Sequence, residues 1–384
     1  MKPQRIVAVA HKEWREVVRD RLFLVLAFVV PAGLMVVIGY GLSLDVDNIP
    51  CVVVDLDGST LSRDYIYRLR SSPYFDWRGH VRDTRLVDDM IARGEIRAAL
   101  VIPQHFEERL AAGRAAPMQI LIDGTFPFRA QTIKGYLAGL VQEANLAGLT
   151  DYMAATRGIT TAQAQSLIEP VRLETRYLYN SRLESNWSIA PKLIMMVLLI
   201  SPPFLTALGI VREKERGSIY NIYASTVTRG EFLAGKLIPF VGISCVNAVV
   251  LWLLAVFLFG APFKGSLLFF APATLLYILC TSNIGLLISS FVRSQLAAMI
   301  IVLIATVPPS MLFSGMVVPI ESLERGARVF AHLLPAMHYT RIVVGVFLKD
   351  VGPPVLLVPL VVLAAYACVL YTLAYWFFRK RPKA

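Results

Sequence analysis

Long apolar runs alternate with short charged segments along most of this 384-residue chain. A helix needs about 20 apolar residues to cross the hydrocarbon core of a bilayer. Six runs reach that length, so we expect a polytopic α-helical membrane protein. The first run is longer than the core of a secretory signal and is expected to stay as an uncleaved anchor. The predicted transmembrane helices cover residues 22–44, 188–211, 237–260, 266–291, 296–317 and 354–378.

The segment between the first two runs, residues 45–187, has a different pattern. Short β-branched stretches alternate there with stretches of helical spacing, which is typical of a sheet covered by helices. We therefore expect a small α/β domain inserted between the first and second spans. Its predicted strands cover residues 51–55, 98–102 and 118–122, and its predicted helices cover residues 61–69, 83–94, 105–112, 129–152 and 160–183.

Three further segments are not simple spans. Residues 1–21 carry apolar residues at helical spacing among charges, which predicts an amphipathic helix on the cytoplasmic membrane surface with Trp14 at headgroup depth. Residues 318–353 contain apolar stretches too short to cross a bilayer, which predicts an external re-entrant helical hairpin. Residues 379–384 are expected to form a cytoplasmic tail.

The distribution of charged residues predicts which segments lie on the cytoplasmic side of the membrane. The chain is 56% hydrophobic and has a formal net charge of +11, and the basic excess falls in residues 1–21, in 212–236, at Arg293 and in the tail, whereas residues 45–192 are almost neutral. Basic loops are retained on the cytoplasmic side of a membrane. Both termini and residues 212–236 are therefore predicted to be cytoplasmic, and the α/β domain extracytoplasmic. Since the charge follows the topology, we expect no nucleic-acid partner.

Candidate catalytic and metal-binding groups are sparse, and we expect neither an enzyme nor a metal site. Cysteines at 51, 245, 280 and 368 have neither the spacing of a metal site nor a partner for an internal disulfide in the external domain. No ionisable residue lies in the middle of a span, which argues against ion-coupled transport. Neutral polar residues in the spans are expected to hydrogen-bond between helices, with substrate contact as the alternative. They are Ser201, Asn247, Ser282, Asn283, Ser289 and Ser290.

Residues 212–236, the coupling segment, form the most highly charged interval between two predicted spans. Within it, residues 230–236 nearly spell a phosphate-binding loop, but Leu237 replaces the hydroxyl residue that would bind Mg²⁺. This stretch is therefore not expected to bind ATP. Residues 218–225 could form a short amphipathic helix that seats in a groove of a soluble partner. Composition allows a solvated loop equally well.

The coupling segment resembles a signature of ABC-2 type exporter permeases. Arg212-Glu-Lys-Glu-Arg-Gly-Ser218 is similar to the family's E-[RK]-E-x-G-[ST] element, and Glu231-Phe-Leu-Ala-Gly-Lys-Leu-Ile-Pro239 is similar to the E-x3-G-K-x2-P element that follows. One span, a large external domain and five further spans also resemble the family's architecture. Thr226 departs from the proline that many members carry. The residues that resemble the family's re-entrant hairpin include Ser314, Gly315, Pro319, Pro335 and Tyr339.

This resemblance implies the transmembrane permease subunit of an ABC exporter in a bacterial inner membrane. ATP and Mg²⁺ would bind a separate ATPase subunit, so no cofactor is expected on this chain. The implied partners are that ATPase, a second permease chain (identical or a paralogue), a periplasmic adaptor protein and membrane lipids. The residues implied to couple to the ATPase are Arg212, Glu213, Lys214, Glu215, Gly217, Ser218, Glu231, Gly235 and Lys236.

The implied substrate is a drug, a lipid or another amphiphile. A function of a different class stays open at this stage. The chain could be a membrane-anchored receptor or assembly scaffold that uses its external domain to bind a ligand or a partner. That alternative accounts for the external domain, but it gives no role to the five later spans or to the hairpin.

Overall fold

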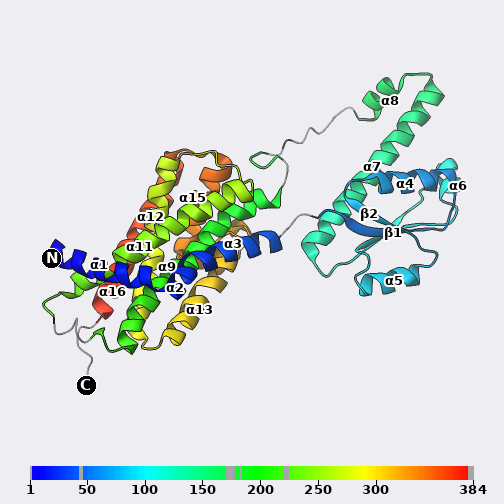
Figure 1. Ribbon diagram of the computed structural model, residues 1–384. Helices are drawn as coiled ribbons and strands as arrows, with labels where there is room; N and C mark the ends of the chain where they lie inside the picture. Colours follow the sequence, from blue (N-terminus) through cyan, green and yellow to red (C-terminus); the bar gives the residue numbers. More distant parts are fainter. Residues whose placement is uncertain are drawn as a thin grey trace. The chain divides into compact units, whose positions relative to one another are not determined.

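The chain forms two compact units, which are described separately (Figure 1). The computed structural model describes residues 2–42, 46–169, 176, 178–181, 184–219 and 225–378. The first unit, called the helical unit, combines Met1–Ser43 with Arg176–Ala384. The second, called the α/β unit, comprises Leu44–Thr175.

The helical unit contains, within the described residues, six helices or joined helices that are long and apolar enough to cross a membrane. The prediction of a polytopic helical membrane protein is thereby confirmed. The first candidate span joins α2 (Arg21–Leu24), a π-helical turn η1 (Val25–Val29) and α3 (Val30–Gly41). The others are α9 (Ser185–Glu215), α11 (Arg229–Leu253) with the π-helical turn η2 (Leu254–Leu258), α12 (Leu267–Phe291), α13 (Gln295–Phe313) and α16 (Pro353–Phe377).

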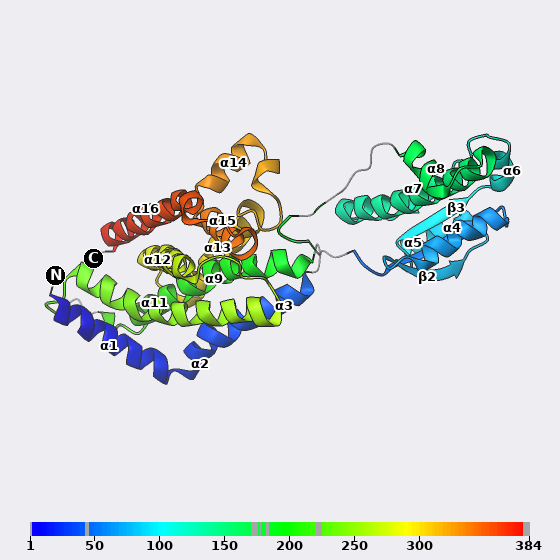
Figure 2. The ribbon, with the colours of Figure 1, turned by 90° about the horizontal axis from the view of Figure 1, so that it is seen from above.

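Helix α9 forms the centre of the helical unit. It is the most deeply buried of the six candidate spans. It packs against α3, α11, α12, α13 and the shorter helix α15 (Pro335–Val344), which surround it in Figure 2. In the apolar core that results, the stacked rings of Tyr277 and Tyr339 lie 4.1 Å apart and the Tyr277 hydroxyl donates to the Met195 carbonyl.

Consecutive spans run in opposite directions, so that every second connection lies at the same end of the helical unit. Lys214, near the end of α9, donates to the carbonyls of Ser289 and Val292 at the end of α12. At the start of α11, Phe232 packs on Phe378, which follows α16, with ring centroids 5.4 Å apart. At the opposite end, the Gly265 amide donates to Val346 at 2.8 Å. The end of α9, the start of α11 and the residue after α16 thus lie at one end of the helical unit. Its cytoplasmic sidedness stays a prediction.

The predicted hairpin region contains short helices. They are the 3₁₀ turn η3 (Ile320–Ser322), α14 (Arg325–His332), and α15 with the π-helical turn η4 (Gly345–Lys349). The axes of α14 and of α15 with η4 differ by 83° across a short break. Two short helices with a sharp bend are consistent with a hairpin, and its depth in the membrane stays a prediction.

The predicted coupling segment is partly helical. Helix α9 continues to Glu215, and α11 begins at Arg229. The short helix predicted for residues 218–225 falls largely on residues 220–224, which lie outside the described residues. Ile219, at its edge, is buried in a cluster with residues of α9, α11 and α12.

The α/β unit has a four-stranded sheet in the order β2-β1-β3-β4. β1 is parallel to β2 and β3, and β3 is antiparallel to β4. Helices α4, α6 and α7 pack on one face and α5 on the other, so both faces are covered, as the alternating pattern predicted. The elements are β1 (Ile49–Asp55), α4 (Thr60–Ser71), β2 (Phe75–His80), α5 (Thr84–Ala92), β3 (Ala98–Ile102), α6 (Phe106–Ala111), β4 (Gln119–Ile122), α7 (Pro127–Arg157) and α8 (Thr161–Ile168).

One element of this unit was not predicted, and one local prediction was wrong. Strand β2 was missed because Phe75-Asp-Trp-Arg-Gly-His80 is mostly polar, as suits an edge strand with one neighbour. The helix predicted for residues 160–183 ends at Ile168 instead. The sequence has proline at 170, which disfavours helical backbone at Glu169, and Glu169 has φ −116° and ψ 73°.

An ion pair after β4 makes the stability of the α/β unit sensitive to acid. Hydrogen bonds from the Thr125 side chain and main chain, with the Arg97 guanidinium, lower the pKa of Asp123 to about 2. This contribution is present above about pH 4 and is lost as the pH falls towards 2. A fragment spanning residues 46–169 is expected to lose more thermal stability between pH 5 and pH 2.5 than its Asp123→Asn variant. Equal losses would show that Asp123 is not ionised in the folded unit at low pH.

Candidate functional site

A buried carboxylate on α1 (Pro3–Arg19) marks the candidate site. α1 packs along α11, and its buried side chains are Glu13 and Val17. Glu13 is only 3% exposed. Because a buried charge is costly unless it is paired, the surroundings of Glu13 must supply a cation.

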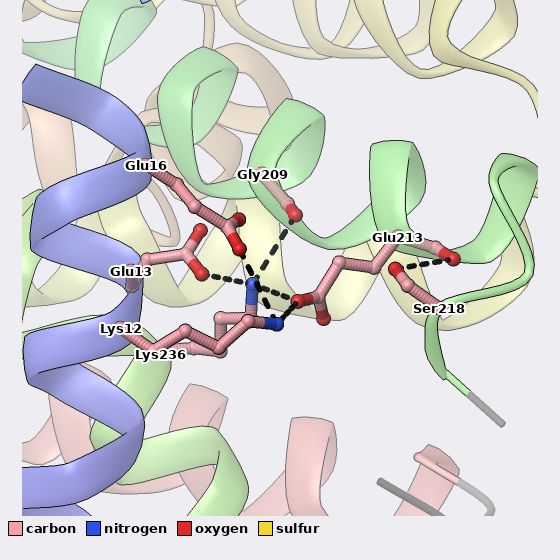
Figure 3. A network of polar contacts seen from close by, with 7 residues as sticks. All are labelled: Lys12, Glu13, Glu16, Gly209, Glu213, Ser218 and Lys236. Atoms are coloured by element: carbon pink, nitrogen blue, oxygen red, sulfur yellow. Dashed lines mark hydrogen bonds and ion pairs between the residues drawn. The ribbon is translucent and has the colours of Figure 1, made fainter. Parts of the chain in front are cut away.

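Lys236 on α11 supplies that cation. Its ammonium contacts the Glu13 carboxylate, lies 3.0 Å from Glu213 Oε1 and donates to the Gly209 carbonyl at 3.5 Å (Figure 3). Lys12 Nζ lies 2.8 Å from the same Glu213 oxygen. Lys12, Glu13, Glu213 and Lys236 form what we call the ion cluster, in which two positive and two negative charges join α1, α9 and α11.

Glu16 borders the ion cluster, 3.5 Å from Lys12. Oxygens of Glu13, Glu16 and Glu213 come within 4.8 Å of one another, the one such carboxylate group found in the described part of the chain. The two lysine ammonium groups lie among these carboxylates and offset two of the three negative charges. The arrangement therefore suits a structural ion network.

The ion cluster shifts the pKa values of both α1 side chains. Burial raises the pKa of Glu13, and Lys236 opposes part of that shift. Burial alone would lower the pKa of Lys12, but its hydrogen bond to Glu213 and the neighbouring carboxylates outweigh burial and raise it. Lys12 thus stays protonated at neutral pH and keeps the Glu213 carboxylate paired.

A second contact holds the first turn of α1 to the start of α11. Thr228 and Glu231 form a capping box that begins α11, in which the Thr228 amide donates to Glu231 at 2.9 Å. The same carboxylate accepts from the Lys2 amide at 2.7 Å and lies 3.7 Å from Arg5. Glu231 therefore caps one helix and anchors another.

Gly235 allows the close approach of α1 to α11. A Cβ at this position would lie 2.7 Å from Val9 Cβ and 3.0 Å from the Ile6 carbonyl oxygen. Any side chain there would push the two helices apart and separate Lys236 from Glu13. The glycine of the sequence signature thus has a packing role at this position.

The other signature residues at the end of α9 connect it to further elements. Arg212 pairs with Asp20, which also caps α2 by accepting from the Leu22 amide at 3.0 Å. Glu215 accepts from the Gln295 amide at 2.7 Å, at the start of α13. With the Lys214 contacts to α12, the end of α9 is bonded to α1, α2, α11, α12 and α13.

Few of the residues predicted to couple to a partner are exposed. Glu213, Glu231 and Lys236 are buried, and Ser218 donates to the Glu213 carbonyl at 3.4 Å. Gly217, two residues after the end of α9, has φ 73°. Glu215 and its neighbour Arg216 are exposed.

The role of Lys12 and Glu13 was not predicted from the sequence. A signal was present, because Glu13 falls four residues after Val9 and four before Val17, on the face of α1 that packs against the spans. A lone acid on an apolar helix face predicts a buried partner.

The residues predicted for the hairpin lie elsewhere in the helical unit. Tyr339 is buried in α15, where its hydroxyl lies 2.9 Å from that of Thr274. Its stacking partner Tyr277 reaches Met195, which is about 27 Å along α9 from Glu213. The predicted coupling residues and Tyr339 of the predicted hairpin therefore lie at different heights along α9. Of the remaining members, Ser314 donates to the Ser310 carbonyl, Gly315 has φ 79°, Pro319 precedes η3 and Pro335 begins α15.

A cleft of about 660 Å³ opens beside the ion cluster, between α1 and the end of α9. Charged residues of both signs line it, including Arg5, Glu16, Arg212 and Arg216. Arg216, which directly follows α9, is exposed and lines the cleft. α1 and the coupling segment thus form this cleft together, and its lining also includes apolar side chains such as Val9 and Phe23.

Residues 21–376 match the family described as ABC-2 family transporter protein. The chain belongs to the ABC-2 family. It is 30% identical to the probable multidrug ABC transporter permease YbhS of Escherichia coli, over 98% of this chain and 97% of that one. It is 25% identical to the probable multidrug ABC transporter permease YbhR of the same organism, over 94% and 95%. It is 24% identical to the linearmycin resistance permease protein LnrN of Bacillus subtilis, over 86% and 88%.

Proposed function

We propose that this chain is the transmembrane subunit of an ABC exporter whose separate ATPase subunit drives the export of a drug, a lipid or another amphiphile. Membership of the ABC-2 family, the six candidate spans and relatives named as multidrug permeases support this proposal. In this account the protein lies in a bacterial inner membrane. Its termini and coupling segment face the cytoplasm, and the α/β unit lies outside.

The observation that carries the proposed mechanism is the set of bonds around the coupling segment. One end of the segment is the last turn of α9 and the other is the first turn of α11. The ion cluster and Glu231 join both turns to α1, while Lys214 and Glu215 join α9 to α12 and α13. A push on this segment by an ATPase would therefore move five helices together: α1, α9, α11, α12 and α13. Such coordinated movement is what coupling to alternate access requires.

ATP and Mg²⁺ belong on the partner in this account. The near match to a phosphate-binding loop, residues 230–236, lies inside helix α11. A phosphate-binding loop needs free backbone amides around the phosphates, whereas the amides of Glu231 and Phe232 are bonded to Thr228 and those of residues 233–236 are used within α11. Lys236 is also engaged by Glu13 and Glu213. These features support an export subunit that relies on another chain for hydrolysis.

A second permease chain, identical or paralogous, completes the proposed transporter, and a periplasmic adaptor would extend it outward. The middle parts of the spans carry no charged side chain. An amphiphilic substrate that crosses between them would therefore meet no buried charge, which agrees with the proposed substrate class.

We call the cleft between α1 and the end of α9 the docking surface, because the ATPase is proposed to bind there. Arg216 lines this surface but is not part of the ion cluster, so changing Arg216 tests the surface alone. Arg216→Glu is expected to lower ATP-dependent efflux of ethidium by at least about tenfold, because it reverses a charge at the docking surface. The assay uses cells that express the chain with its ATPase. Glu213→Ala is less informative, since Glu213 also holds the internal ion cluster.

The matched control is Arg114→Glu, at an exposed position of the α/β unit. It is expected to keep efflux at the wild-type rate. Both variants should reach the membrane at equal levels. Efflux that is unchanged in Arg216→Glu would remove this residue from the docking surface.

A further inference from the structure

Helix α1 has a second apolar face, which is turned away from the rest of the helical unit. Its inner face, which includes Val9 and Val17, packs on α9 and α11. Val7, Trp14 and Val18 are nevertheless 63%, 46% and 48% exposed. At about 100° per residue, these three side chains fall within about 40° of one another and about 120° from the direction of the inner face. We call them the outer stripe of α1.

The side of α1 that borders the outer stripe carries basic side chains and no acidic one. Arg15 and Arg19 are exposed and lie four residues apart, so they are neighbours on the helix surface. Neither forms an ion pair with another described residue, because the acids next to them in sequence, Glu16 and Asp20, each pair with a different basic residue. Two like charges at this spacing repel each other. An anion bound between the two arginines would therefore stabilise the helix.

An anionic headgroup on an apolar chain matches both features at once. A soluble anion or an acidic peptide would pair with the arginines but leave Trp14 in water, whereas tryptophan is enriched where a bilayer meets water. The outer stripe is also continued along the chain by the exposed Leu22, Val25 and Val29, whose spacing places them on one face of the first candidate span. Figure 2 shows α1 at the edge of the helical unit, leading into α2 and that span. Lipid that covers the exposed face of the span therefore reaches the outer stripe.

We propose that α1 binds anionic phospholipids, with Arg15 and Arg19 on the phosphate and the outer stripe on the upper part of the acyl chains. A guanidinium suits this role because it can donate two parallel hydrogen bonds to phosphate oxygens. Arg5 and Lys12, which line the docking surface, lie nearly opposite the outer stripe on the helix. Lipid and ATPase would thus contact different sides of α1.

The proposal goes beyond ATP-driven export, because it names a class of lipid that the permease itself selects. It depends on α1 lying at a membrane surface. It does not depend on an ATPase or on an exported substrate, so it can fail while the proposed function stands, and the reverse.

Trp14 is a fluorescent probe at the proposed site. The full chain would be reconstituted in nanodiscs of phosphatidylcholine with a minor fraction of phosphatidylglycerol, and either lipid would carry bromine on its acyl chains. Bromine quenches only a nearby indole, and comparison with the Trp14→Phe chain isolates the Trp14 emission. Brominated phosphatidylglycerol is expected to quench Trp14 about fivefold more per labelled lipid than brominated phosphatidylcholine, the effect of about one arginine at an anionic surface. This preference is expected to fall as NaCl rises from about 0.05 M to about 0.5 M, because salt screens exposed charges.

The arginines are tested by Arg15→Gln combined with Arg19→Gln, which is expected to leave Trp14 quenched equally by the two lipids. The matched control is Arg229→Gln combined with Arg293→Gln, at two exposed arginines outside α1 that are predicted to lie on the same side of the membrane. It should keep the preference. Equal quenching by both lipids in the wild type, or an equal loss of preference in both double variants, would overturn the proposal. So would a Trp14 that neither lipid quenches, which would assign the outer stripe to a second copy of the chain or to a co-purified protein.

Discussion

Replacing Lys236 with methionine is expected to destabilise the helical unit by about 3–5 kcal/mol and to abolish export. Methionine keeps much of the length of the side chain but removes the ammonium between Glu13 and Glu213. Those carboxylates are 3% and 5% exposed, so water cannot replace the lost cation. α1 would then separate from α9 and α11. Thermal unfolding of the purified chain in detergent measures the loss.

A double variant distinguishes charge from packing in this result. Adding Glu13→Gln to Lys236→Met leaves Lys12 paired with Glu213, so the double variant is expected to be more stable than Lys236→Met alone. Lys134→Met, at an exposed site of α7, is the control and should unfold like wild type. If the two substitutions at the ion cluster were simply additive in their destabilisation, the cluster would not act as a charge network.

Gly285→Ala is expected to cost about 3 kcal/mol or more, from the addition of a single methyl group. Gly285 lies where α12 crosses α9, and its Cβ would come within 2.2 Å of the Pro203 carbonyl oxygen and 2.6 Å of Pro203 Cα. Both are backbone atoms, so relief requires the two central helices to move apart. The expected result is a lower unfolding temperature and loss of export.

Gly242→Ala is the matched control, because it makes the same change in α11 where the new Cβ would meet no atom within 4 Å. It is expected to leave stability unchanged or slightly higher, as alanine is the better helix former. A Gly285→Ala chain as stable as the Gly242→Ala chain would contradict the close packing of α9 on α12.

The spans and most elements of the α/β unit could be predicted because each depends on a local pattern. Runs of apolar residues are long enough to identify α9 or α12 without knowledge of their neighbours. Strand β3 was predicted at its observed bounds, Ala98–Ile102, because all five of its residues are apolar and two of them, Val101 and Ile102, are β-branched. Strand β2 was missed because its polar residues and Gly79 carry no such signal.

The ion cluster depends on tertiary packing and so was only partly predictable. Lys236 and Glu13 are 223 residues apart in the sequence, and their pairing requires α1 to fold back along α11. The resemblance to a family signature identified Glu213, Glu231 and Lys236 as important. It could not indicate that these side chains point inward to α1, while Glu215 and Arg216 stay exposed.

Co-purification is the most direct test of the central claim that this chain works with a separate ATPase. The tagged wild-type chain, produced at its native level and extracted in mild detergent, would be isolated and its bound proteins identified by mass spectrometry. The account predicts an ABC ATPase in an amount comparable to the chain, depleted in Arg216→Glu and kept in Arg114→Glu. Recovery of signalling or assembly proteins without any ATPase would contradict it and favour a receptor or scaffold.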